Sequence, residues 1–333
     1  MKITNRLLYS QVNADMSRNS EILFRLGRQI SSGKRINTPS DDPLGLSSVL
    51  TSRTELNMFD QYGKAITYAT GWLNVMESLV QDTDDLLARA SEIAVQQDSS
   101  TATDETREGA AQEIKQIRSM LLSNASAKYG NKYIFSGTRT QTQPYLFVDA
   151  EKLGADVNTV ADLPPAATEG DAAFVTTLGK MYVFNEGQWK SVYQGNDSTI
   201  SLQISRTSTV QTNIPGSSVF SNQDGDASMT LLRLEKALRD NDVDGIRSAI
   251  SNIESSSVIV NNNLALIGAN LNKLEHMKTV LDSSTLDTKE SISNIEDLDY
   301  AEAITSLQNQ QTIYQATLKS ASMITGLSLV DYI

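Results

Sequence analysis

Cysteine is absent from this 333-residue sequence, and histidine occurs only once. The absence of cysteine excludes disulfides, thiolate zinc sites and cysteine nucleophiles. His276 lies among Lys273, Glu275 and Lys278 in a helical stretch. We interpret it as part of a solvated helix face, not as a catalytic or metal-ligating residue.

Long hydrophobic runs are also lacking. No stretch approaches the roughly 18 consecutive apolar residues that a membrane-spanning helix needs. The composition is 39% hydrophobic and 20% charged, with a mean hydropathy of −0.29. The first nine residues start basic but turn polar at once, without the apolar core of a secretory signal peptide. We therefore expect no membrane association and no cleaved signal.

Basic residues are outnumbered by acidic ones, which gives a formal net charge of −12. A polyanionic nucleic acid would repel such a surface, so we expect no nucleic-acid partner. The charge is unevenly distributed, because residues 1–40 carry a formal +5 and residues 282–333 a formal −6. These two end segments are electrostatically matched, and we expect them to lie against each other.

Apolar residues recur at steps of three and four in two long stretches. The first series comprises Ile66, Ala69, Leu73, Met76, Val80, Leu87, Ala90 and Ala94, and the second Ile246, Ile250, Ile253, Val260, Leu264, Ile267, Leu271, Leu274 and Leu281. Stripes of about four heptads are typical of coiled coils. Each long helix needs an equally long partner to bury its stripe. The two are therefore expected to pack together, antiparallel within one chain.

Helix boundaries are marked around these stripes. Asp42 is a good N-cap, and Pro43 fits the first helical position of a helix that begins there. Gly33 is expected to end the preceding helix, since its surroundings do not form a phosphate loop. Shorter helices are predicted from about 104 to 128, capped by Thr103 or Asp104, and from about 227 to 239.

The terminal segments have helical patterns with thin apolar stripes. The N-terminal stripe contains Ile3, Leu7, Ile22, Leu26 and Ile30, and the C-terminal stripe contains Ile304, Leu307, Tyr314, Leu318 and Ala321. Such stripes do not hold an isolated helix in water. We predict that both are completed by neighbouring copies in an assembly, and that these segments are disordered or loosely folded in the monomer.

The middle of the chain has strand patterns instead. β-branched and aromatic runs include 174–177, 181–184, 189–193 and 200–204, separated by the hairpin signals 178–180 and 185–188. The aromatic residues Tyr182, Trp189 and Tyr193 allow two interpretations. They form either the core of a small β domain, which we favour, or an exposed patch that stacks on sugars.

No catalytic, cofactor-binding or metal site is predicted. Acidic clusters at 82–85 and at Glu296, Asp297 and Asp299 could bind calcium in principle. Neither has the glycine-containing loop of an EF-hand. Solvated acidic surface is the better interpretation, and we do not expect an enzyme.

The predicted fold class is mainly α with a β-rich insertion. The N- and C-terminal halves are expected to form a long antiparallel coiled-coil or bundle rod, with a central β domain at its far end. Residues 1–40 and 286–333 would be polymerisation segments. Residues 41–136 and 226–285 would form the rod, and 137–225 the inserted surface domain.

Four stretches carry a family resemblance. They are Leu26–Asn37, Pro39–Pro43, Lys132–Thr138, and the C-terminus with Asp299–Ala303 and Leu327–Ile333. Together they resemble the flagellin superfamily over about 1–140 and 226–333. The proline after the paired aspartates and the Asp-Tyr ending are more similar to the members at the hook-filament junction than to flagellin. The central residues 162–189 resemble a small β-module of phage tail proteins.

The resemblance implies a structural subunit of the extracellular flagellum. It would join the hook, through the preceding hook-associated protein, to the flagellin filament as a ring of copies. It also implies type III export without a cleaved signal, and a cytoplasmic chaperone on the C-terminal helix. Two alternatives are a flagellin-like filament subunit and a surface adhesin or carbohydrate-binding module on a helical stalk.

Overall fold

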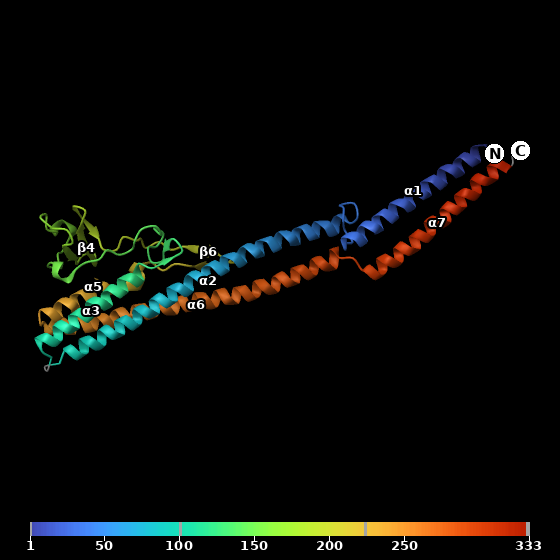
Figure 1. The fold of residues 1–333 in the computed structure, drawn as a ribbon. Coiled ribbons are helices and arrows are strands. Elements are labelled where there is room, and N and C mark those ends of the chain that lie inside the picture. The colour runs from blue at the N-terminus through green and yellow to red at the C-terminus, as the bar shows by residue number, and fades with distance from the viewer. Residues whose placement is uncertain (1, 100–101, 223–224, 331–333) are drawn as a thin grey trace. The chain divides into compact units, whose positions relative to one another are not determined.

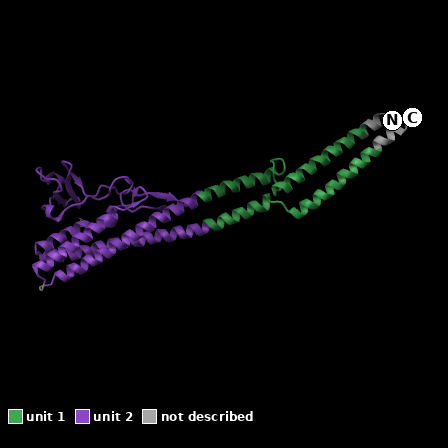
Figure 2. Ribbon diagram, in the orientation of Figure 1, with its two compact units in different colours: residues 1–60, 281–333 green, residues 61–280 purple. Residues whose placement is uncertain are grey.

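The computed structural model describes residues 2–99, 102–222 and 225–330. The chain is mostly helical and divides into two compact units, shown in different colours in Figure 2. Unit 1 comprises residues 1–60 and 281–333, and unit 2 comprises residues 61–280. The predicted class, helices from both chain ends with a β-containing middle, is confirmed.

Unit 1 contains the terminal helices α1 (Lys2–Ser32) and α7 (Tyr300–Val330), which lie side by side in Figure 1. The start of the long helix α2 (Pro43–Gln97) and the end of α6 (Val243–Glu296) also belong to it. Leu298 N–H donates to Gly33 O at 3.0 Å, whereas Asn19 is bonded to Gln310 and Thr317. The pairing of α1 with α7 is therefore antiparallel.

Unit 2 has a helical core made by the remainder of α2 and α6 together with α3 (Asp104–Ala125) and α5 (Ala227–Arg239). Every apolar residue of the predicted 66–94 stripe is buried. Thr83, which interrupts that stripe, is buried too, and its hydroxyl donates to Leu79 O at 2.7 Å. The buried hydroxyl of Thr83 is therefore hydrogen-bonded within the helix, and the buried stripe continues through this position.

The residues of the predicted stripe on α6 differ in how deeply they are buried. Buried positions recur at steps of seven: Ile246, Ile253, Val260, Ile267, Leu274 and Leu281. The residues between them, Ile250, Leu264 and Leu271, are only half-buried. Ser257 takes the place between Ile253 and Val260 and donates to Asp84 Oδ1 on α2 at 2.6 Å. This bond, together with the 2.9 Å ion pair of Arg247 with Asp98, orients α2 antiparallel to α6 as predicted.

Helix α3 begins at the predicted cap, where Thr103 and Thr106 form a reciprocal capping box. It ends at Ala125, earlier than the predicted 128. The next residues pair instead as a hairpin, β1 (Lys128–Tyr129) with β2 (Lys132–Tyr133). Gly130 in its turn has φ +59°, a conformation that favours glycine.

Three short strands form the main sheet of the insertion, in the order β3 (Ala172–Val175), β4 (Lys180–Asn185) and β5 (Gln188–Ser191), all antiparallel. Both predicted hairpin turns are present. The fourth predicted run does not join this sheet, because β6 (Ser201–Gln203) pairs with β7 (Thr209–Gln211). The remaining short elements are η1 (Ala150–Lys152), η2 (Val160–Asp162), α4 (Gly216–Phe220), β8 (Ser221–Asn222) and β9 (Gly225–Asp226).

Among the described residues, no helix is both long enough and apolar enough to cross a membrane.

Candidate assembly surface

The pairing of α1 with α7 leaves much apolar surface uncovered. No described side chain of α1 is fully buried, and among residues 300–323 of α7 only Ala303 is. Most predicted stripe residues are half-buried: Ile22, Leu26, Ile30, Leu307, Tyr314 and Ala321. Ile304 and Leu318 are 45% and 40% exposed, and Leu7 is also exposed. The side chain of Ile3 lies outside the described residues.

Only one side of the heptad stripe of α7 is covered within the chain. Tyr300, Ile304 and Leu318 fall at heptad spacing and are exposed, whereas the buried Ala303 and the half-buried Gln310 and Thr317 lie on the neighbouring face. We call the stripe Tyr300, Ile304, Leu307, Tyr314, Leu318 and Ala321 the α7 seam. One copy of the chain thus covers one side of the α7 seam and leaves the other side in water.

The contact between the two terminal helices contains three hydrogen-bonded polar residues that the apolar pattern did not reveal. Gln310 Nε2 donates to Asn19 Oδ1 at 3.0 Å, and Asn19 Nδ2 donates to Thr317 Oγ1 at 3.3 Å. These bonds fix which residues of α1 lie opposite α7.

Further exposed apolar side chains belong to unit 1. They are Phe24, Leu44, Leu50, Leu286, Ile313 and Met323. Isolated exposed apolar residues are ordinary, but a concentration of them marks an interaction surface. Covering them would contribute about 25 cal/mol for each Å² removed from water. Unit 1 is therefore the part of the chain best suited to contact other subunits.

Two turns meet at the base of the terminal helices. We call residues 33–42, residues 295–300 and Arg53 the latch. Its backbone contacts are Arg35 N–H to Glu296 O at 2.7 Å and Leu298 N–H to Gly33 O at 3.0 Å. Gly33 ends α1 with φ +72°, as predicted from the sequence. The turn after α1 is thereby bound to the junction between α6 and α7.

Glu296 is the ionic centre of the latch. Its carboxylate accepts from Lys34 Nζ at 2.9 Å and from Arg53 Nη2 at 2.7 Å, and its side chain is 8% exposed. Burial acts to raise the pKa of Glu296, but the hydrogen bonds and charges of Lys34 and Arg53 outweigh it and hold the pKa below its ordinary value. The interpretation of this carboxylate as solvated surface was wrong, because it is buried between two cations.

The paired aspartates of the resemblance motif are capping residues. Asp41 Oδ2 accepts from the backbone N–H groups of Asn37 and Thr38, at 3.0 and 2.8 Å. Asp42 Oδ1 accepts from Gly45 N–H at 2.9 Å, as an N-cap of α2 should. The Gly45 bond lowers the pKa of Asp42, with a further contribution from Arg35. The predicted cap at Asp42 is confirmed.

The three candidate aromatic residues of the insertion do not form one exposed patch. Tyr182 and Trp189 are partly buried against a small core of Leu163, Ala173 and Val175. Trp189 Nε1 donates to Pro164 O at 3.1 Å. Tyr193 lies in a different group, with its ring centroid 5.2 Å from that of Tyr145. The arrangement favours the core interpretation over a sugar-stacking platform.

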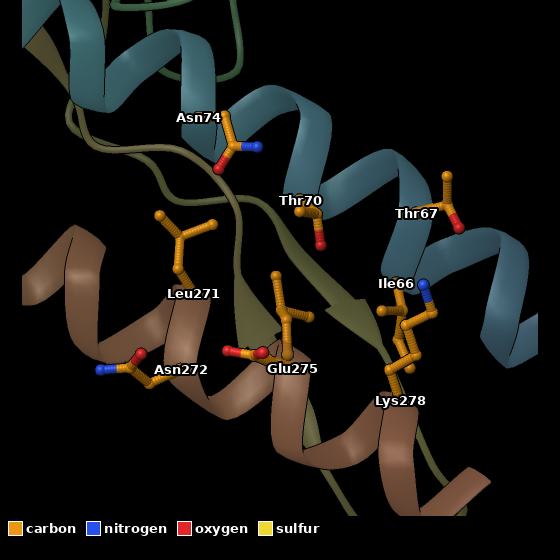
Figure 3. A pocket seen from close by; sticks show the side chains of 9 residues that line it. Ile66, Thr67, Thr70, Asn74, Leu271, Asn272, Glu275 and Lys278 are labelled. Carbon is orange, nitrogen blue, oxygen red and sulfur yellow. The ribbon is translucent and has the colours of Figure 1, made fainter. Parts of the chain in front are cut away.

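A groove of about 350 Å³ opens between α2 and α6 within unit 2 (Figure 3). Thr70 and Asn74 of α2 face it from one side, and Leu271 and Glu275 of α6 from the other. Its lining contains one carboxylate and one ammonium, from Glu275 and Lys278, and no histidine or tyrosine. The nearby His276 is exposed on α6, where its solvated position agrees with the sequence prediction.

Both ends of the chain match known helical regions. The bacterial flagellin N-terminal helical region matches residues 3–140, and the bacterial flagellin C-terminal helical region matches residues 250–333. The chain belongs to the flagellin family. The two matched regions contain the latch, the terminal helices and most of the α2–α6 pair.

Relatives that match over nearly the whole chain include both hook-associated proteins and flagellins; flagellin of Listeria innocua is 23% identical over 97% of this chain and 95% of its own length. Flagellar hook-associated protein 3 of Salmonella typhimurium is 25% identical over 99% of this chain and 98% of its own length. The protein of the same name from Escherichia coli is 26% identical over the same shares. The crystal structure of flagellar hook-associated protein-3 from Legionella pneumophila covers 74% of this chain and 98% of its own, with a TM-score of 0.57 at 13% identity, a likeness in fold. This member of the flagellin family is a structural component of the bacterial flagellum.

Proposed function

We propose that this chain forms the junction between the hook and the flagellin filament. The observation that carries the proposal is the α7 seam, half covered by α1 and open on its other side. Further subunits would supply apolar surface to cover it, and the full-length similarity to hook-associated protein 3 supports a position at the hook. The work of such a chain is mechanical and involves no catalysis.

The partners would be of three kinds. Copies of the same chain would form a ring, in which the exposed residues of α1 and α7 contact their neighbours. The preceding hook-associated protein would lie on one side of the ring and flagellin on the other. All three contacts would use unit 1, in which exposed large apolar side chains are more frequent along the chain than in unit 2.

Export would precede assembly. A chain of this kind would leave through the flagellar type III apparatus without a cleaved signal, and would fold at the tip. Before export, the exposed seam of α7 would be an aggregation hazard, because contiguous apolar surface associates non-specifically. A cytoplasmic chaperone that covers α7 would remove that hazard.

Electron microscopy of a strain that lacks the gene tests the junction role. The expected result is cells with hooks but without filaments, and restoration of filaments when the gene is supplied again. Filaments on cells without the gene would contradict the proposal. Purified chain that grows by itself into long filaments would favour the alternative, a filament subunit.

The insertion provides the test against an adhesin. Removing residues 140–225 would also remove Phe220, whose ring packs on Phe135 at a centroid distance of 5.2 Å. A narrower replacement of residues 154–190 by a short glycine-serine linker keeps that contact. It also keeps the bond from Leu146 N–H to Val192 O. The junction role predicts motile cells with filaments. Loss of surface adhesion in this variant would favour the adhesin, provided that a strain lacking the whole gene still makes filaments.

A further inference from the structure

The latch is built from more than one kind of contact. Besides the two backbone bonds, Arg35 Nη2 donates to Ile295 O at 2.8 Å, and Gln29 Nε2 donates to Arg35 O at 2.7 Å. Ile36 is buried, and its side chain lies close to Gly45 at the start of α2. Backbone bonds, the Arg35 side chain and the ion pair of Lys34 with Glu296 thus hold the two turns together, while Ile36 packs the first turn against the start of α2.

The contacts of the latch are stronger than those of the terminal helices. Lys34 and Arg53 are 42% and 45% exposed, so solvent screens part of each ion pair, but the side chain of Glu296 is only 8% exposed and accepts charge-assisted bonds from both. Along α1 and α7, by contrast, the described contacts are half-buried and partly polar. When the chain is free, the latch should therefore be ordered even where the helices beyond it are not.

The latch lies where pairing of α1 with α7 has its highest free-energy cost, which is at initiation. Starting a helix is unfavourable, whereas extending one adds a bond for each residue fixed. Bringing together two segments that are far apart in the chain also costs loop-closure entropy. The latch brings Gly33, the first residue after α1, close to Tyr300, the first residue of α7. The hydroxyl of Tyr300 lies only 2.9 Å from where a Cβ on Gly33 would be.

We propose that the latch is a preformed nucleus that holds the bases of α1 and α7 together in the free chain. The two terminal helices then pair outward from it when the chain enters the assembly. This order of assembly rests on the proposed junction function. It makes Glu296, Lys34 and Arg53 positioning residues for assembly, although none of them needs to touch another subunit.

Hydrogen exchange of the dilute, full-length chain tests the nucleus directly. In the wild-type chain, peptides that cover 33–42 and 295–300 should be protected. Glu296→Gln should make them exchange at least about tenfold faster, because Lys34 and Arg53 lose their counter-charge. Glu290→Gln is the matched control, since Glu290 is exposed on the same helix. Peptides of α3 should exchange equally in all three proteins, which shows that unit 2 is folded.

Equal exchange of the latch peptides in the wild type and in Glu296→Gln would overturn the proposal. If Glu296→Gln unfolds the chain broadly, a charge-inverted variant with Lys34→Glu, Arg53→Glu and Glu296→Lys tests the same ion pairs. Restored protection in that variant supports ion pairing as the cause. Protection that stays lost overturns it.

A second measurement separates the latch from the junction function. Cells that carry only the Glu296→Gln chain should show at least about tenfold fewer filaments, while Glu290→Gln behaves as wild type. Full filament numbers together with lost latch protection would overturn the role of the latch but leave the junction function standing. Failure of the wild-type gene to restore filaments would instead overturn the junction function, whatever the latch does.

Discussion

Arg118 of α3 and Glu235 of α5 form an ion pair in which each side chain is only 1% exposed. The Arg118 Nη2 to Glu235 Oε2 distance is 3.3 Å, and Arg118 Nη1 donates to Val148 O at 2.5 Å. Burial lowers the pKa of Arg118, although the charge of Glu235 opposes that shift. The pair therefore connects α3 and α5 to Val148 in the first part of the insertion.

Glu235→Gln is expected to destabilise unit 2 by about 3–5 kcal/mol, because it leaves the buried guanidinium of Arg118 without a counter-charge. Urea unfolding followed by far-UV circular dichroism measures the loss. Glu254→Gln, at an exposed position of α6, is the control and should change the free energy of unfolding by less than about 0.5 kcal/mol. The double variant Arg118→Met with Glu235→Leu should be much closer to the wild type. A single variant as stable as the wild type would contradict this account.

Gly33→Ala should weaken the latch by about 1–3 kcal/mol, since the residue has φ +72° and its new Cβ would lie 2.9 Å from the Tyr300 hydroxyl. Hydrogen exchange of residues 33–42 measures the effect. Adding Tyr300→Phe relieves the clash but not the backbone strain, so it should recover only part of the loss. Gly27→Ala, which meets no atom within 4 Å inside α1, should not loosen the latch. Normal protection in Gly33→Ala would show that the turn tolerates a side chain.

The latch should be sensitive to acid. Because the pKa of Glu296 is lowered in the folded chain, its contribution is fully present above the ordinary carboxyl value of 4.5 and is lost as the pH falls through the lower, folded-state pKa. The ratio of latch exchange rates between Glu296→Gln and the wild type should therefore approach one in acid. Comparing the two proteins at each pH removes the intrinsic pH dependence of exchange. A ratio that does not change with pH would argue against ionisation of Glu296 as the cause.

Ile304→Ser combined with Leu318→Ser should block assembly without unfolding the chain. Both side chains are exposed on the α7 seam, so the free energy of unfolding should change by no more than about 0.5 kcal/mol. Filament counts by electron microscopy should fall strongly. Leu178→Ser is the matched control, because Leu178 is 50% exposed beside the hairpin turn of the insertion. Undiminished filaments in the double variant would mean that the seam faces water in the flagellum.

The disorder expected of residues 1–40 and 286–333 in the monomer stays a prediction, as do the three domain boundaries; the proposed latch would be an ordered exception that overlaps these segments, at 33–42 and 295–300. The structure pairs α1 with α7 in a single chain. The two end segments carry opposite net charge, and among the described residues one ion pair joins them, that of Lys34 with Glu296. Strong amide protection of residues 2–30 in the dilute monomer would contradict the expected disorder.

Much of the helical core could be predicted from the sequence because its signal is periodic and local. The step-of-seven positions on α6, from Ile246 to Leu281, are buried in the structure as their spacing predicts. The cap at Asp42 and the turn at Gly33 are equally local, since each depends on a few adjacent residues. The flagellin-like motifs lie in these same local features, so the family could be recognised before the fold was known.

Residue order over short distances was enough to predict the main helices, the caps at Asp42 and Thr103, the turns at 178–180 and 185–188, and the flagellin resemblance. The folded chain was needed to show that Glu296 is buried between Lys34 and Arg53, and that Arg118 meets Glu235. It also decided which side of the α7 seam stays open. The physical reason is that ion pairs and packing faces join residues hundreds of positions apart, and no periodicity along the chain records which distant charge will lie opposite.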